Sequence, residues 1–317
     1  MVAIVVLDDY QNVALQMADW SRLRSDHRLA VLDRPLETEE AAARALSGFD
    51  VVCVMRERTP LPRSLIARLP GLRLIVTTGH RNAAIDMAAA DERGILVCGT
   101  GSSGHATAEL TFGLILSLAH HIPYEAQAMR AGRWQTTVGI DLAGRTLGLI
   151  GLGRLGERVA RIARAFAMRP IAWSQNLTAE QAAAHGVERV EKDELFRRSD
   201  ILTIHARLSE RTRGLVGERE LGLMKPTALV VNTSRGPIID EAALLAALKS
   251  GRIAGCGIDV YDTEPLPASH PLRSEPRALL TPHLGYVTEE TYRSFYGGTV
   301  AAIEAWLAGK PINVLTP

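Results

Sequence analysis

Short apolar runs rich in β-branched residues alternate along the chain with longer stretches that carry one apolar face. In the first third these runs cover residues 2–7, 51–55, 74–77 and 95–98. Runs of this length and composition are typical of strands buried on both faces, and the stretches between them have room for helices. The first third therefore predicts an α/β fold with a parallel sheet.

The same alternation begins again in the middle of the chain. The stretch 105–130 offers Leu110, Leu114 and Leu118 for burial and predicts one long connecting helix. Six further strands are then predicted at residues 146–150, 170–173, 201–204, 228–231, 257–260 and 279–281. These make a complete second sheet, so we expect the helix predicted at 289–307 to return to the first domain. The expected domains are residues 1–100 with 287–317, and residues 101–286.

Composition narrows the class of protein. The 317 residues are 47% hydrophobic and 22% charged, which suits a globular chain of two domains. Its 36 basic and 35 acidic residues give a net charge of +1, so no overall field attracts nucleic acid or an anionic membrane. We therefore expect neither as a partner, and we expect a ligand to be recognised locally.

The cysteine pattern and the lack of targeting segments indicate a reducing compartment. Cys53, Cys98 and Cys256 lie far apart in apolar runs, as buried thiols do. The N-terminus lacks a signal-peptide pattern, and no apolar run reaches the roughly 18 residues of a membrane span. The nine histidines show no paired ligand spacing, so no metal site is predicted. The expected location is the cytoplasm.

A glycine fingerprint is the first chemical signal. Gly151, Gly153 and Gly156 form a GxGxxG pattern between the apolar run 147–150 and a helical pattern over 157–167. The first glycine permits a tight turn, the second lets the backbone approach a pyrophosphate, and the third lets helix and strand pack closely. The helix N-terminus then offers amide donors to the phosphates. The pattern predicts a dinucleotide site, although a glycine turn can also join strand to helix without any ligand.

The end of the next predicted strand bears on the choice of cofactor. An acid that binds the adenine ribose is expected there, about twenty residues after the glycines. Ser174 stands at that position instead, and no arginine or lysine follows directly. The cofactor is therefore NAD or NADP, with the preference open. The alternative is that residues 174–176 are only a polar strand end.

Three short motifs place polar side chains just after later strands. They are Asn-Thr-Ser-Arg-Gly at 232–236, Asp-Val-Tyr-Asp-Thr-Glu-Pro at 259–265 and Thr-Pro-His-Leu-Gly at 281–285. Ligands of open parallel sheets bind at the carboxyl ends of the strands, so the three motifs predict one common site.

With these motifs in this order, the chain resembles the D-isomer-specific 2-hydroxyacid dehydrogenase family over nearly its whole length, including glyoxylate/hydroxypyruvate reductases and phosphoglycerate dehydrogenases. The resemblance implies a Rossmann-type cofactor domain and a flavodoxin-like, discontinuous substrate domain, both doubly wound. It implies that a small 2-oxo or 2-hydroxy acid binds in the cleft between them. The expected reaction is hydride transfer between NAD(P) and that acid.

The resemblance also assigns catalytic residues. Arg235, Glu264 and His283 match the family's arginine, glutamate and histidine. Histidine can exchange a proton near neutral pH, a carboxylate can favour and orient its imidazolium, and arginine can bind a substrate carboxylate as a fork. Taken singly, each has an ordinary alternative: His283 as a polar group at a helix end, Glu264 as a surface acid and Arg235 as a solvated loop residue.

Further contacts follow from the same likeness. Besides the three glycines and Ser174, the expected cofactor contacts are Arg154, Leu155, His205, Ala206, Thr233, Ser234, Arg235, Asp259, His283 and Gly285. Asp259 matches the acid that holds the carboxamide end, although it could instead only cap a loop. The expected substrate contacts are Arg56, Thr78, Gly79, His80, Arg235 and His283. Glu57 and Tyr286 depart from the family's usual serine and glycine, which leaves the particular acid open.

Two other functions and the oligomeric state complete the expectations. A formate- or phosphite-oxidising enzyme would share the hydride step, and a dinucleotide-sensing corepressor would share the cofactor domain. The apolar stretch 105–130, together with the resemblance, suggests a homodimer.

Overall fold

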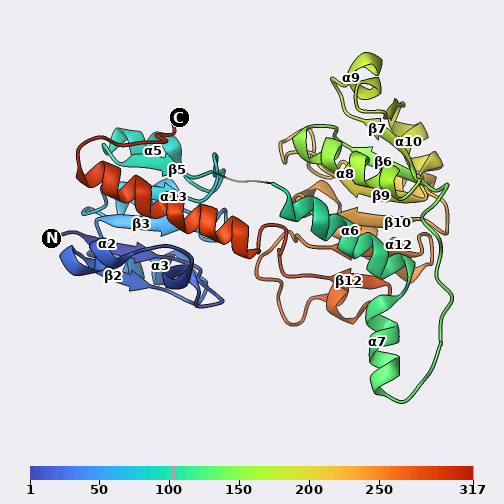
Figure 1. Ribbon diagram of the computed structural model, residues 1–317, viewed down its shortest axis with the longest axis horizontal. Coiled ribbons are helices and arrows are strands. Elements are labelled where there is room, and N and C mark those ends of the chain that lie inside the picture. Colours follow the sequence, from blue (N-terminus) through green and yellow to red (C-terminus); the bar gives the residue numbers. More distant parts are fainter. Residues whose placement is uncertain (102–103, 317) are drawn as a thin grey trace. The chain divides into compact units, whose positions relative to one another are not determined.

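Two compact units make up the structure, which is a computed structural model describing residues 1–101 and 104–316 (Figure 1). Unit 1 comprises Met1–Ser103 with Val287–Pro317, and unit 2 comprises Gly104–Tyr286. Each is built on a parallel sheet, of five and seven strands respectively. The predicted α/β class with two parallel sheets is thus confirmed. Among the described residues, no helix is long and apolar enough to cross a membrane.

Unit 1 has the strand order β2-β1-β3-β4-β5, the flavodoxin-like arrangement. Its strands are β1 (Ala3–Val6), β2 (Arg28–Val31), β3 (Val51–Val54), β4 (Leu74–Thr77) and β5 (Leu96–Gly99). Its helices are α1 (Ala14–Met17), α2 (Ser21–Asp26), α3 (Glu39–Leu46), α4 (Arg63–Ala67), α5 (Met87–Glu92) and α13 (Glu289–Leu307). The last helix, red in Figure 1, packs on β4 and β5, so the C-terminal segment completes this unit.

Unit 2 has the strand order β12-β11-β10-β9-β6-β7-β8, which extends the Rossmann order by one strand. The strands are β6 (Thr146–Ile150), β7 (Arg169–Trp173), β8 (Glu188–Arg189), β9 (Ile201–Ile204), β10 (Leu229–Asn232), β11 (Gly255–Ile258) and β12 (Ala278–Leu280). The helices are α6 (Ala106–Ala119), α7 (Ile122–Arg130), α8 (Arg154–Ala165), α9 (Ala179–Ala183), α10 (Lys192–Arg198), α11 (Glu218–Leu223) and α12 (Glu241–Lys249). Short 3₁₀ turns cover Gly236–Ile238 and Pro271–Ser274.

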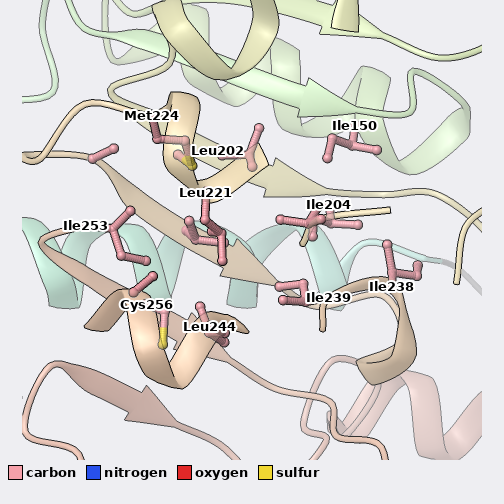
Figure 2. Packing of buried hydrophobic residues seen from close by; sticks show 14 of the residues in the cluster. Ile150, Leu202, Ile204, Leu221, Met224, Ile238, Ile239, Leu244, Ile253 and Cys256 are labelled. Atoms are coloured by element: carbon pink, nitrogen blue, oxygen red, sulfur yellow. The ribbon is translucent and has the colours of Figure 1, made fainter. Parts of the chain in front are cut away.

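Both faces of the second sheet are buried, because successive side chains of a strand point to opposite faces. Leu147 and Leu149 pack with α6 and α8 on one face. Ile150 and Leu202 pack with residues of α10, α11 and α12 on the other (Figure 2). This explains why the strands read as continuous apolar runs. Apart from Thr203 and the edge strand β8, the polar residues of these strands stand at the strand ends, and the three motifs lie at such ends.

The helix expected over 105–130 is two helices, and this part of the prediction is wrong. The first helix ends at Ala119, and His121 then adopts a left-handed conformation with φ 52°. Pro123 stands in the first turn of α7. A proline there loses no hydrogen bond, whereas inside a continuous helix it would remove one and clash with the preceding turn.

Two edge strands were not expected from the apolar pattern. Strand β2 pairs with β1 over four residues, and β8 pairs with β7 over two. Their sequences, Arg-Leu-Ala-Val and Glu-Arg, are short or charged, as is common at sheet edges. Apolar content alone therefore predicts too few strands at the edges of the sheets.

Candidate active site

The glycine loop after β6 has the geometry that a dinucleotide requires. Gly151 has φ 95°, and a side chain there would lie 2.9 Å from the carbonyl oxygen of His205. A side chain at Gly156 would lie 2.3 Å from the carbonyl oxygen of Gly151. Gly153 faces open space, and as the N-cap of α8 it leaves the first amides of that helix without a side-chain cap. The residues therefore fit a pyrophosphate at this helix N-terminus.

The strand ends beside the glycine loop add a second observation. His205 directly follows β9, and its Nε2 lies 3.1 Å from Thr203 Oγ1. Its Nδ1 is buried and has no hydrogen-bond partner among residues 1–101 and 104–316. Burial lowers the pKa of His205 to about 3, so the ring is neutral at physiological pH. A buried polar atom of this kind calls for a ligand or water, which fits the cofactor contact expected here. Ser174 follows β7 as predicted.

His283 and Glu264 form a short hydrogen bond. His283 Nδ1 donates to Glu264 Oε2 over 2.6 Å, and the other carboxylate oxygen accepts from the backbone amide of Tyr261 at 2.9 Å. The Tyr261 hydroxyl in turn donates to the carbonyl oxygens of Ile258 and Thr281. The ring of Tyr286 meets the His283 ring edge-on at 5.2 Å between centroids. The hydrogen bond at Nδ1 thus orients the imidazole ring. Nε2 is the ring nitrogen that remains for exchange of a proton.

Asp259 holds the loop that carries His283. Its Oδ1 accepts from Thr281 Oγ1 at 2.6 Å and from the Leu284 amide at 2.7 Å, while Oδ2 accepts from the Gly285 amide at 2.9 Å. Burial raises the pKa of this carboxyl group, and these hydrogen bonds act in the opposite direction. The loop-capping alternative for Asp259 therefore has a structural basis, and its contact with a cofactor stays a prediction.

Arg235 lies in a loop fixed from several sides. Asn232 Nδ2 donates to the Arg235 carbonyl oxygen at 2.9 Å, and Arg235 Nη1 donates to the Ser234 carbonyl oxygen at 2.7 Å. Ser234 Oγ donates to the carbonyl oxygen of Ala206, and Thr233 Oγ1 lies 2.9 Å from Thr111 Oγ1. The predicted residues after β9 and β10 are thus in direct contact.

Gly236 of this loop lies close to the backbone of the segment that leads to Glu264, and a substitution there tests this close approach. A side chain at Gly236 would lie 2.1 Å from the Tyr261 carbonyl carbon and 2.6 Å from the Asp262 nitrogen. Because both are backbone atoms, we expect Gly236→Ala to lower the free energy of unfolding by about 1–3 kcal/mol and to lower kcat. Gly222→Ala is the control, because its side chain meets nothing within 4 Å and the residue lies in α11. Chemical denaturation measures both, and equal stabilities of the two variants would contradict the close approach.

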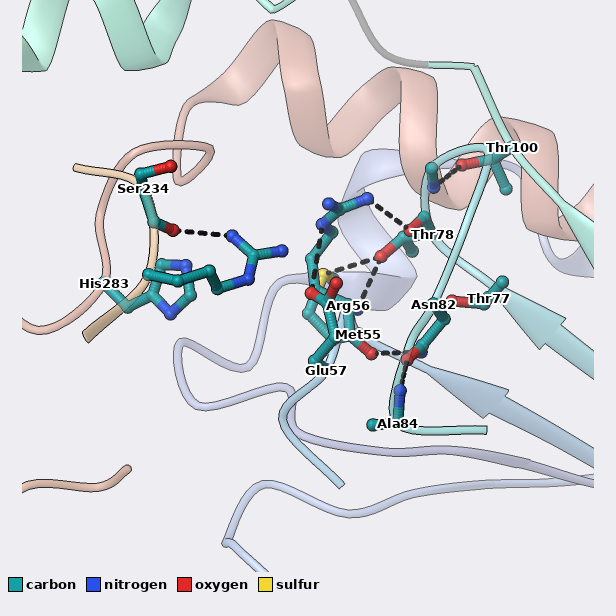
Figure 3. Close-up of polar contacts among 12 residues, drawn as sticks. Met55, Arg56, Glu57, Thr77, Thr78, Asn82, Ala84, Thr100, Ser234 and His283 are labelled. Carbon is teal, nitrogen blue, oxygen red and sulfur yellow. Dashed lines mark hydrogen bonds and ion pairs between the residues drawn. The ribbon is translucent and has the colours of Figure 1, made fainter. Parts of the chain in front are cut away.

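In unit 1, Arg56 and Thr78, two of the predicted substrate residues, are hydrogen-bonded to each other (Figure 3). The Arg56 amide donates to Thr78 Oγ1 at 2.8 Å, its Nη1 donates to the Thr78 carbonyl oxygen at 3.0 Å, and its Nε lies 3.8 Å from Glu57 Oε2. The amide of Thr78 donates to Val54 and that of Gly79 to Thr100 Oγ1. Both amides are therefore engaged within the protein, and a substrate carboxylate would have to replace these bonds. His80 is exposed beside them.

Several supporting residues did not stand out in the sequence. Asn82 Nδ2 donates to the Arg56 carbonyl oxygen and to Thr77 Oγ1, and Thr100 fixes Gly79. In unit 2, Thr107 Oγ1 donates to the Gly285 carbonyl oxygen across 178 positions of sequence. Thr281, the first residue of its motif, is the one whose place in a recognisable pattern could have indicated a role. The others act through contacts between distant segments, which a single sequence does not show.

Comparison with known proteins agrees with this arrangement. Residues 112–285 match the model of the D-isomer-specific 2-hydroxyacid dehydrogenase NAD-binding domain. A hydroxypyruvate reductase of Blautia hydrogenotrophica is 31% identical, with 98% of this chain and 99% of that protein covered. A D-3-phosphoglycerate dehydrogenase of Methanocaldococcus jannaschii is 38% identical over 84% of this chain, which spans 51% of that longer relative.

A solved structure extends the likeness to the whole fold. The phosphoglycerate oxidoreductase of Vibrio cholerae O395 superposes with a TM-score of 0.92 at 34% identity, with 98% of this chain and all of that chain covered. The range 112–285 that matches the family model contains the glycine loop and the segments that carry Arg235, Glu264 and His283. The chain therefore belongs to the D-isomer-specific 2-hydroxyacid dehydrogenase family.

Proposed function

We propose that the protein interconverts a small 2-oxo acid and the corresponding D-2-hydroxy acid, with NAD(P) as hydride carrier. The observation that carries the proposal is the 2.6 Å hydrogen bond between His283 Nδ1 and Glu264 Oε2. Family membership supports the reaction class. The pairing supports separate roles for the two residues. A carboxylate that is hydrogen-bonded to one imidazole nitrogen orients the ring, so that the other nitrogen can transfer a proton.

The roles of the residues follow from their chemistry. When bound, the nicotinamide cofactor supplies or accepts the hydride, and the glycine loop with the N-terminus of α8 would hold its pyrophosphate. His283 Nε2 gives a proton to the oxygen of the oxo acid in reduction and takes it back in oxidation. Glu264 stabilises the protonated ring, and Arg235 binds the substrate carboxylate as a fork. In unit 1, we propose that Arg56 and the loop Thr78, Gly79 and His80 take part in substrate recognition.

The direct test follows nicotinamide absorbance with NADH and NADPH across glyoxylate, hydroxypyruvate, pyruvate and phenylpyruvate. Reduction of at least one oxo acid, with the D-hydroxy acid as product on chiral chromatography, is the expected result. Formate and phosphite belong in the same panel, because oxidation of either would favour the other hydride chemistry. Cofactor binding without turnover of any of these compounds would favour a dinucleotide-sensing protein.

Cofactor choice depends on Ser174, and we expect the wild type to accept NADPH at least as well as NADH. Serine lacks the carboxylate that would repel a 2′-phosphate, and no cation directly follows it. Ser174→Asp should shift the ratio of the two dissociation constants toward NADH, with Ser174→Asn as a control that adds bulk without charge. Fluorescence titration of both reduced cofactors measures the ratio. A wild type that binds NADH a hundredfold more tightly than NADPH would contradict this interpretation.

The assembly and the compartment are also proposals. We propose a homodimer, which sedimentation tests directly, and a strict monomer would overturn that view. We propose the cytoplasm as the location, in keeping with the three free, buried cysteines. Burial raises the pKa of the Cys256 thiol to about 12, which keeps it protonated and unreactive.

A further inference from the structure

A separate hollow of about 810 Å³ lies in unit 2 at the opposite edge of its sheet from the residues described above. Thr146, Arg169 and Glu188, which line it, are the first residues of β6, β7 and β8. The glycine loop, Arg235 and His283 all follow the carboxyl ends of strands, and parallel strands place their two kinds of end at opposite edges. We call this hollow the basal pocket. Its volume lies in the range of small-molecule sites.

The charge of the basal pocket is strongly one-sided. Five basic side chains and one acidic side chain, Glu188, line it; the basic ones are Arg164, Arg169, Arg197, Arg198 and Lys225. Positive charge gathered in a concave site raises the local concentration of anions. The net charge of the whole chain is only +1, so this concentration of cations is a local feature.

Not all of these cations are available to a ligand. Arg198 binds both oxygens of Glu188 at 2.7 Å, and Lys225 Nζ lies 2.7 Å from Asp200 Oδ1. Arg197 has only a 3.5 Å contact with Asp193, and Arg219 binds the same carboxylate oxygen at 2.6 Å. The charges of Arg198 and Lys225 are thus paired within the lining of the basal pocket. The charge of Arg197 is only weakly paired.

Arg164 and Arg169 are the strongest candidates for ligand contacts. In the described part of the chain, neither forms an ion pair with a carboxylate. Arg169 Nη2 donates to the carbonyl oxygen of Gly144 at 2.7 Å, which orients its guanidinium. Arg164 extends over Gly186, where a side chain would lie 2.4 Å from its Nη1. Guanidinium groups bind phosphate oxygens as forks, so two or three of them favour a phosphorylated ligand over a simple carboxylate.

Besides Thr146, Gly186 and the charged residues, the lining of the basal pocket is apolar. Met168, Pro170, Ile171 and Val187 are buried, and Ala183 is exposed. An apolar lining beside arginines suits a molecule that has both phosphate groups and an apolar or aromatic part. It does not suit nucleic acid, which needs an extended basic surface that follows a backbone.

We propose that the basal pocket binds an organic phosphate that carries an apolar or aromatic group, at a site separate from the one that binds cofactor and substrate. The guanidinium groups of Arg164, Arg169 and Arg197 contact the phosphates, and Ala183 with the apolar lining contacts the rest of the molecule. This proposal does not depend on the reaction that the enzyme catalyses.

The test is a calorimetric titration of the full chain with ATP and, separately, with inorganic tripolyphosphate. Saturating NADH is present throughout, so that neither probe occupies the glycine loop. We expect one ATP site per chain, with tripolyphosphate binding several-fold more weakly because it lacks the apolar part. Arg164→Ala/Arg169→Ala should weaken ATP binding at least tenfold, and higher salt should weaken it in the wild type.

Matched variants separate this site from general charge effects. Arg161→Ala/Arg24→Ala removes the same charge from exposed positions outside the pocket, and it should change the ATP dissociation constant by less than twofold. Ala183→Glu, at an exposed lining residue, should abolish binding by adding a carboxylate. Absence of ATP binding at millimolar concentration, or equal losses in the two double variants, would overturn the proposal. Melting temperatures and oxo-acid reduction near the wild-type values establish that the variants are folded.

Discussion

Replacement of His283 by alanine should lower kcat for oxo-acid reduction by about 10²- to 10⁴-fold, the usual contribution of a positioned acid or base. The dissociation constant of the cofactor should stay within about twofold of the wild-type value, because the expected cofactor contacts lie mainly in the glycine loop and the strand ends. Single-turnover kinetics with a good substrate and fluorescence titration of the cofactor measure the two quantities.

The backbone of His283 calls for a second variant. Its φ of 54° lies in the left-handed region, which costs free energy for most side chains and is tolerated better by asparagine. His283→Asn should therefore fold at least as stably as the wild type and still lack the proton donor. Both variants should be similarly slow. If both retained near wild-type rates, the role proposed for His283 would be wrong and another group would have to supply the proton.

Glu264→Gln should give a different signature. The amide can still accept the hydrogen bond from His283 Nδ1, but it no longer stabilises the protonated ring by its charge. We expect kcat for reduction to fall about 10- to 100-fold at neutral pH. Steady-state kinetics of oxo-acid reduction measure this loss.

A merely structural role for Glu264 predicts another pattern. The carboxylate also accepts from the Tyr261 amide, so its loss could loosen the loop without affecting proton transfer. Glu264→Asp is the control, because it keeps the charge and shortens the reach. Loosening alone would lower kcat in Glu264→Asp as far as in Glu264→Gln. Equal losses in the two variants would show that the charge does not support the histidine.

Where the sequence was most informative, one physical signal was strong and local. Buried strands of a parallel sheet are continuously apolar, so β6, β9 and β10 could be predicted closely, and Gly151, Gly153 and Gly156 marked the turn after β6. The pairing of His283 with Glu264 was expected from family resemblance rather than from spacing. The side chains meet as that resemblance implied, at 2.6 Å.

What could not be predicted depends on contacts between segments that are distant in sequence. The break at His121 depends on one left-handed residue before Pro123, inside an otherwise continuous apolar pattern. The role of Asp259 as an acceptor depends on the backbone amides of Leu284 and Gly285. Every residue type except proline has such an amide, so the sequence does not show which ones are bound. The cations of the basal pocket come from α8, β7, α10 and the segment after α11, and they looked like ordinary surface charges along the sequence.

The discontinuity of unit 1 has a consequence for synthesis on the ribosome. Helix α13 packs on β4 and β5, and the Leu315 amide donates to the Val97 carbonyl oxygen. Every residue of unit 2 is translated before these partners exist. Unit 2 can therefore fold during translation. The first hundred residues can complete their fold only after the last thirty have been synthesised, and until then part of their sheet is uncovered. During that interval the nascent chain exposes apolar surface on β4 and β5, which α13 later covers.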